Sequence, residues 1–260
     1  MNHSRSRVGR FALRSLGVLS MTAAFTLAPA AASATVVLPW IAQTRGALAP
    51  SSDLHVLNPG KAPLAVRLAL VPLGGGDPIP CGARVVEPQA TWSTADARRR
   101  LCGNADAAGI LLVSFEDGAE EPVIASTDTV VAADGYRFAR TSPTLHAGNA
   151  ALPGQAQHLV GLRQNAASRT ALWLFNPSTE PGEYDVIYRA LDGTELGVLP
   201  AVRLGPGKLR QLSPNQHPLP ATSSGGLTVE IVVRSGALLS FGIVVDDTVA
   251  APTVVAGETR

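Results

Sequence analysis

An internal repeat limits what this chain can fold into more than any other feature of its sequence. Leu54–Gly60 matches Leu172–Ser178, and the asparagines of the two Asn-Pro motifs lie 176 − 58 = 118 residues apart. Further matching segments follow in the same order at offsets of 117 to 119, starting at residues 64 and 182, 85 and 203, 109 and 226, and 128 and 247. Solenoid repeats are roughly 20–50 residues long and sandwich domains roughly 100. The period therefore predicts two similar domains.

Alternation of apolar and polar residues predicts β-strands inside each copy. Every second residue is apolar in two segments: Leu64, Val66, Leu68 and Leu70, and Leu227, Val229, Ile231 and Val233. A period of two indicates a sheet with one face in a core and the other in solvent. We predict an all-β chain of two antiparallel β-sandwiches, each with about seven strands. A closed barrel is the alternative architecture.

The repeat also predicts domain boundaries. The first sandwich domain is expected over residues 35–140 and the second over 158–256. Residues 141–157 are rich in turn-forming and small residues, which predicts a linker. The best helix candidate is Thr94–Leu101, with Ser93 as its cap.

The second copy carries a recognisable pattern. Its segment Arg169–Phe175 ends in Asn176-Pro177, and Asp192–Gly197 has the form Asp-Gly-x-x-Leu-Gly. This pattern resembles a tandem immunoglobulin-like module of bacterial secreted proteins, of uncharacterised function. The resemblance covers residues 158–256 closely and 36–139 more loosely. It implies a β-sandwich fold and an extracytoplasmic setting, and it implies no catalytic residue.

The N-terminus predicts export. Four arginines precede an apolar stretch over residues 16–27, and Ala32-Ser33-Ala34 supplies the small residues of a cleavage site. A membrane anchor is the alternative, but the apolar run has 12 residues whereas a bilayer span needs roughly 20. We therefore predict a signal peptide over residues 1–34, a secreted or periplasmic location, and no membrane span after cleavage.

Charge and cysteine content narrow the partners and the compartment. Without the four leader arginines, the 21 basic and 20 acidic residues become 17 and 20, a net charge of −3. This balance argues against a nucleic-acid partner, which needs clustered Lys and Arg. Cys81 and Cys102 lie 21 residues apart, a spacing that matches neither a zinc site nor a C-x-x-C motif. In an oxidising compartment the pair is expected to form a disulfide.

Residues capable of catalysis or metal binding are few. The mature chain contains His55, His146, His158 and His217, and none has a partner at catalytic or metal-ligand spacing. The acidic residues Glu116, Asp117, Glu120 and Glu121 could bind calcium, but the alternating acids of a calcium loop are absent, which favours a solvated turn. We predict no cofactor, no metal site and no catalytic residue.

Aromatic residues offer one candidate for ligand binding. Trp40 and Trp173 lie in predicted strands, so they are expected to pack in a core or an interface. Trp92 lies in the predicted disulfide loop and is the best candidate for an exposed platform.

Three hypotheses for function follow. The first is a non-enzymatic exported structural or interaction protein that meets a protein or a cell-surface partner. The second is a carbohydrate-binding or adhesive module that uses Trp92. The third is an enzyme of unrecognised type, with a site at the domain junction near His146 and His158.

Overall fold

The computed structural model describes residues 34–39, 51–103, 109–116, 119–131, 137–213, 226–246 and 251–260. The predicted leader lies outside the described residues except for Ala34, and so do Trp40, Asp117 and His217. Ala32–Arg260 forms one compact unit. Within the described part, no helix is long and apolar enough to cross a membrane.

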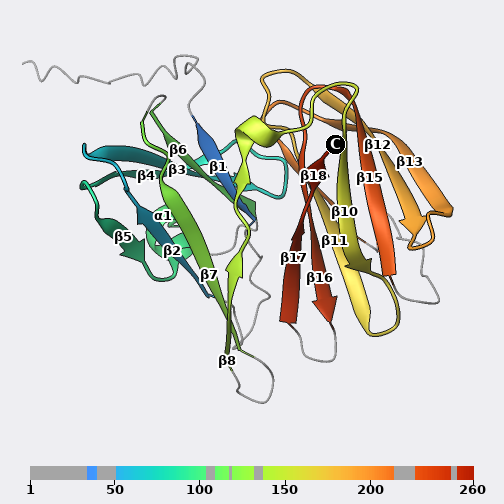
Figure 1. The fold of residues 1–260 in the computed structure, drawn as a ribbon, viewed down its shortest axis with the longest axis horizontal. Helices are drawn as coiled ribbons and strands as arrows, with labels where there is room; N and C mark the ends of the chain where they lie inside the picture. The colour runs from blue at the N-terminus through green and yellow to red at the C-terminus, as the bar shows by residue number, and fades with distance from the viewer. Residues whose placement is uncertain are drawn as a thin grey trace, which may run out of the picture. The chain divides into compact units, whose positions relative to one another are not determined.

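The first half of the chain builds two antiparallel sheets (Figure 1). The first large sheet has the order β4-β3-β6-β1-β9, and the first small sheet has the order β5-β2-β7-β8. These strands are β1 (Thr35–Pro39), β2 (Ser51–Leu57), β3 (Leu64–Pro72), β4 (Ile79–Val86), β5 (Thr91–Thr94), β6 (Gly109–Phe115), β7 (Val123–Val131), β8 (Arg137–Ser142) and β9 (Leu145–His146).

The second half repeats this arrangement strand for strand. The second large sheet has the order β13-β12-β15-β10-β18, and the second small sheet has the order β14-β11-β16-β17. Its strands are β10 (Ala156–Arg163), β11 (Ser168–Phe175), β12 (Gly182–Ala190), β13 (Glu195–Leu204), β14 (Leu209–Leu212), β15 (Gly226–Ser235), β16 (Leu239–Asp246), β17 (Ala251–Ala256) and β18 (Glu258–Thr259). The prediction of an antiparallel, nearly all-β chain is confirmed.

Strand pairing fixes which residues of the two halves correspond. Val113 lies opposite Leu68, and Ile231 lies opposite Val186. Leu68 and Val186 are 118 residues apart, and so are Val113 and Ile231. The match of segments 109 and 226 at an offset of 117 is therefore wrong by one residue. A slip of one residue turns a side chain to the other face of a sheet, and it would match the buried Val113 with the partly exposed Glu230.

A buried asparagine explains why the Asn-Pro motif occurs twice. Asn58 Nδ2 donates to the carbonyl oxygens of Ala62 and Val86 at 2.8 and 2.9 Å, and Asn58 Oδ1 accepts from the Gly60 N–H. Asn176 makes the counterpart bonds at the same offset of 118, donating to Glu180 and Leu204 and accepting from Ser178. Each asparagine thus ties its turn to the neighbouring large sheet, where an apolar side chain would leave these backbone groups unpaired.

Each half has its own apolar core, and a third cluster joins the halves. Alternate residues of β3 and β12 point into the two separate cores, as the sequence pattern predicts. The third cluster takes Val37, Val71, Ile110 and Leu145 from the first large sheet, and Trp173, Phe175, Leu209, Leu239, Phe241 and Ile243 from the second small sheet. We call these two surfaces the docked faces.

The helix begins later than the sequence predicts, and the segment predicted as a linker contains regular secondary structure. Helix α1 spans Ala97–Cys102, so the predicted helix start at Thr94 is wrong. Thr91–Thr94 instead pairs with β2, because ladder hydrogen bonds outweigh a weak local helical preference. Segment 141–157 contains the end of β8, β9, the short 3₁₀ helix Ala147–Asn149 and the start of β10.

Candidate functional site

The disulfide predicted from the cysteine pair is present. Cys81 lies on β4 and Cys102 ends α1, and both belong to the apolar core of the first half. The bond ties the only α-helix in the described part of the chain to the edge of the first large sheet. The bond therefore fixes α1 against the apolar core of the first half.

Trp92 lies on β5, opposite Val56. Its side chain is partly buried and packs against the core of the first half. The Arg84 guanidinium carbon lies 5.8 Å from the ring centroid, within the range of a cation–π interaction. The ring is therefore engaged by the protein itself, and a stacked sugar would have to displace Arg84.

The structure distributes the described histidines over separate places. His55 Nδ1 lies 2.9 Å from Ser93 Oγ on the first small sheet. His158 lies on β10, opposite Glu230 of β15 and Glu258 of β18. His146 Nδ1 lies 2.8 Å from Glu121 Oε1. His146 and Glu121 thus come together from two segments that the sequence did not connect.

The acidic segment near Glu116 is only partly described. Glu116 and Glu120 are exposed, and Glu121 pairs with His146. Over the described ranges, no three His, Cys, Asp or Glu side chains gather as a metal site would require.

Two adjoining hollows flank His146, and together we call them the seam groove. The first, of about 330 Å³, is lined by Val36, Glu121, Pro122, Val123, Ile124, Thr144 and His146. The second, of about 610 Å³, is lined by Thr144, Leu145, His146, Gly148, Asn149, Ala150, Leu152, Gln155, Leu239, Ala256, Gly257, Glu258 and Thr259. Thr144 and His146 belong to both hollows, whereas His158 lines neither.

The seam groove has an apolar floor and an acidic rim. Leu145 and Leu239 belong to the cluster that joins the halves, and they form part of the floor of the second hollow. Glu121 and Glu258 carry the formal charges on the rim, and no Lys or Arg is among the described residues that line either hollow. The groove therefore suits an apolar ligand that carries a hydrogen-bond donor or a positive charge.

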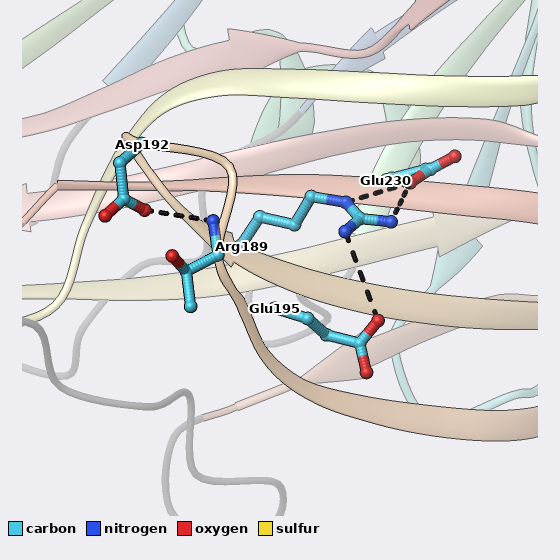
Figure 2. Close-up of polar contacts among 5 residues, drawn as sticks. Arg189, Asp192, Glu195 and Glu230 are labelled. Atoms are coloured by element: carbon cyan, nitrogen blue, oxygen red, sulfur yellow. Dashed lines mark hydrogen bonds and ion pairs between the residues drawn. The ribbon is translucent and has the colours of Figure 1, made fainter.

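The second large sheet presents a polar face where the first large sheet has its docked face. Arg189 donates from Nε and Nη2 to Glu230 Oε2 at 3.1 and 2.9 Å, and Glu195 Oε2 lies 4.0 Å from its Nη1. Figure 2 shows the guanidinium between the two carboxylates. In the same hairpin Asp192 accepts a hydrogen bond from the Thr194 N–H, which holds the pKa of Asp192 below its ordinary value.

Strand register shows which docked residues these polar residues replace. Arg189, Thr228 and Glu230 stand where the first half has Val71, Ile110 and Leu112, at an offset of 118 in each case. His158, opposite Glu230, replaces Val37, which lies opposite Leu112. The first small sheet shows the reverse change: His55, Ala125 and Thr127 replace Trp173, Phe241 and Ile243. We call these two partly exposed surfaces the exposed faces.

A further hollow, of about 430 Å³, lies beside the Gly74-Gly75 turn and residues 203–211. There Lys208 Nζ donates to Asp77 Oδ1 at 2.8 Å and to the Gly76 carbonyl at 3.0 Å. Lys208 holds the pKa of Asp77 below its ordinary value, first through this hydrogen bond and then through its charge. Lys208 is thus paired with a carboxylate of the protein, and so is Arg203, which also lines this hollow and pairs with Glu183.

Comparison with known proteins leaves the site to be interpreted from its own geometry. No family model matches the chain, and neither the curated proteins nor the solved structures contain a match.

Proposed function

We propose that this chain is a non-enzymatic, exported interaction protein, built from two immunoglobulin-like sandwich modules that meet face to face. The observation that carries the proposal is the contrast between the docked faces and the exposed faces. At several equivalent positions the residue is apolar where the halves meet and polar where they do not, as for Val71 and Arg189, whereas the counterparts of Phe175, Leu239 and Phe241 are the apolar but less buried Leu57, Val123 and Ala125. Such a division builds one scaffold from two modules and leaves its outer surfaces available to partners in solution.

Interaction is favoured over carbohydrate binding because of the position of the aromatic residues. Trp173 belongs to the docked faces, and Trp92 packs against a core with Arg84 over its ring. Sugar-binding platforms need an aromatic face open to the ligand. The acidic seam groove, whose described lining contains no aromatic side chain, fits a polypeptide better.

Site-specific cross-linking in the producing cell tests this function. A photoreactive amino acid is placed at Thr228 on one exposed face, at Thr127 on the other, and at Val123 beside the seam groove. We expect adducts with exported or cell-surface proteins at one or more positions, identified by mass spectrometry. As a matched control, the same residue is placed at Ile231, which is buried in the second core. Adducts that form equally at all positions, or at none, would contradict the proposal.

A further inference from the structure

At the first hollow of the seam groove, the two halves carry different side chains at equivalent positions. Val36 lies opposite His146 in the first half, as Gln157 lies opposite Thr259 in the second. Ile124 lies opposite Val56, and Ser240 lies opposite Leu174. Leu174 is the counterpart of Val56, 118 residues further along the chain. Val36, Ile124 and His146 therefore correspond to Gln157, Ser240 and Thr259.

In the second half, hydrogen bonds close this space. Ser240 Oγ donates to Gln157 Oε1 at 2.7 Å, and Gln157 Nε2 donates to Thr259 Oγ1 at 3.2 Å. Gly257 lies so close to this network that a Cβ at its position would collide with Ser240 Oγ. Its counterpart in the first half is Thr144, which lines the open hollow.

A polypeptide segment also lies along the same rim in the second half. The Ala151 N–H donates to the Leu238 carbonyl and the Leu238 N–H donates to the Ala151 carbonyl, both at 2.9 Å. Thr259 Oγ1 donates to the Asn149 carbonyl at 3.0 Å. Residues 149–151 thus pair with this rim as an added strand does with a sheet edge.

The first half has the same rim with different chemistry. The counterparts of Leu238 and Thr259 are Pro122 and His146, and both line the 330 Å³ hollow. Val36 and Gln157 are 121 residues apart, and the same offset makes residue 30 the counterpart of Ala151. Residue 30 belongs to the predicted leader. Glu121 stands where the second half has Ala237, so a carboxylate occupies this position in the first half and a methyl group in the second.

We propose that the first hollow of the seam groove binds an extended segment of another polypeptide, in which a small apolar residue is followed by a basic one. The segment donates a backbone N–H to the Pro122 carbonyl, as Ala151 does to Leu238 in the second half. Pro122 has no N–H, so it makes only this one of the two bonds that Leu238 makes.

The apolar side chain of the segment packs against Val123, which is 59% exposed and lines the hollow beside the buried Val36 and Ile124. The basic side chain of the segment pairs with Glu121. This proposal rests on the proposed function and specifies a site and a partner class for it.

A closed variant of the first half provides the test. Val36→Gln, Ile124→Ser, Thr144→Gly and His146→Thr together transfer the hydrogen-bonded network of the second half into the hollow. The exported protein and the closed variant are each used to select from a phage-displayed library of random heptapeptides. We expect peptides in which Lys or Arg adjoins Ala or Val, and these should bind the closed variant at least about tenfold more weakly by fluorescence anisotropy.

Glu121→Gln separates the charge from the shape of the hollow. It should weaken the selected peptides about threefold, the effect of one exposed ion pair, and leave their norleucine-substituted versions unchanged. Unchanged thermal unfolding and an intact disulfide show that each variant is folded. Equal binding to the protein and its closed variant, selection of acidic peptides, or no selection at all would overturn the proposal.

Cross-linking in the cell distinguishes failure of this site from failure of the function. If the closed variant captures the same partners as the unmodified protein, the interaction function stands and the hollow is not its site. If the peptides bind the hollow as expected and no partner is captured at any position, the peptide site stands and the proposed function fails.

Discussion

The docked and exposed faces come from one repeated sheet pattern, yet their side chains differ in polarity or size at equivalent positions. Val71 is fully buried between the halves, whereas Arg189, at the equivalent position, forms a partly exposed ion pair. Trp173 is buried and stacks on Phe241, with ring centroids 5.5 Å apart, whereas its counterpart His55 is partly exposed beside Ser93. The fold alone therefore does not decide which faces associate, because a few apolar side chains on otherwise equivalent surfaces do so.

The largest effect is expected from exchanging Val71 and Arg189, the apolar and the charged residue at one pair of equivalent positions. Val71→Arg would bury an unpaired guanidinium in the docked faces and lower the free energy of unfolding by about 4 kcal/mol or more. The reciprocal change, Arg189→Val, removes one partly exposed pair and should cost about 1 kcal/mol or less. Urea unfolding measures both. Similar losses for the two variants would mean that the two faces are not used differently.

Removing the largest docked side chain should have the next largest effect. Trp173→Ala deletes a ring buried against Phe241 and is expected to cost about 3 to 4 kcal/mol. The matched variant His55→Ala should change the free energy of unfolding by no more than about 0.5 kcal/mol. A loss below about 1 kcal/mol for Trp173→Ala, measured by urea unfolding, would show that the docked faces are loosely packed.

Replacing the repeated asparagines should lower the free energy of unfolding by the same amount in each half. Asn58→Ala and Asn176→Ala each leave buried backbone carbonyls without a donor, so each should cost about 2 kcal/mol. Differential scanning calorimetry measures the loss. A cost confined to one half would show that the other half satisfies its turn by different means.

The smallest effect concerns acid pH. The Ala201 N–H, and then Arg234, hold the pKa of Asp185 on the second large sheet below its ordinary value, and Lys208 does the same for Asp77. A carboxylate with a lowered folded-state pKa stabilises the fold above its unfolded value, about 3.9, and this contribution is lost as pH falls through the folded-state pKa. Asp77 is almost fully exposed and Asp185 is partly buried beside Arg234, so the loss should be small, and smaller for Asp77 than for Asp185.

NMR titration of the carboxyl carbons separates these two groups. Lys208→Met should return the pKa of Asp77 toward its ordinary value and leave that of Asp185 unchanged, because Arg234 still pairs with Asp185. Arg234→Gln should do the opposite. A shift of both pKa values in either variant would show that the two sites are coupled.

The sequence predicts those parts of the fold that depend on local pattern. Alternation along β3 and β15 places their buried faces correctly. The disulfide between Cys81 and Cys102, expected for an exported chain whose cysteine spacing fits neither a zinc site nor a C-x-x-C motif, is confirmed. The start of α1 is misplaced because the pairing of Thr91–Thr94 with β2 is a tertiary effect. The alignment of Gly109 with Gly226 fails because residue identity says nothing about which face of a strand a side chain occupies.

The seam groove could not be predicted, because its parts are distant in the sequence. Val36, Glu121 and His146 come from three separate segments, and only strand pairing brings them to one hollow. His146 was a candidate for a site at the domain junction, but nothing local indicated that Glu121 would be its partner. The contrast between His55 and Trp173 was visible in the aligned repeat, yet its meaning depends on knowing that one face is docked.

The polar face of the second large sheet limits how such a chain can lengthen. If duplication added a third module in the same orientation, its small sheet would cover Arg189 and Glu230 and strip them of water. A longer array would first need apolar residues at five positions, those of His158, Arg189, Thr228, Glu230 and Glu258. A handful of surface side chains thus decides whether this face could take up a further module, and duplication of the module alone would not be enough.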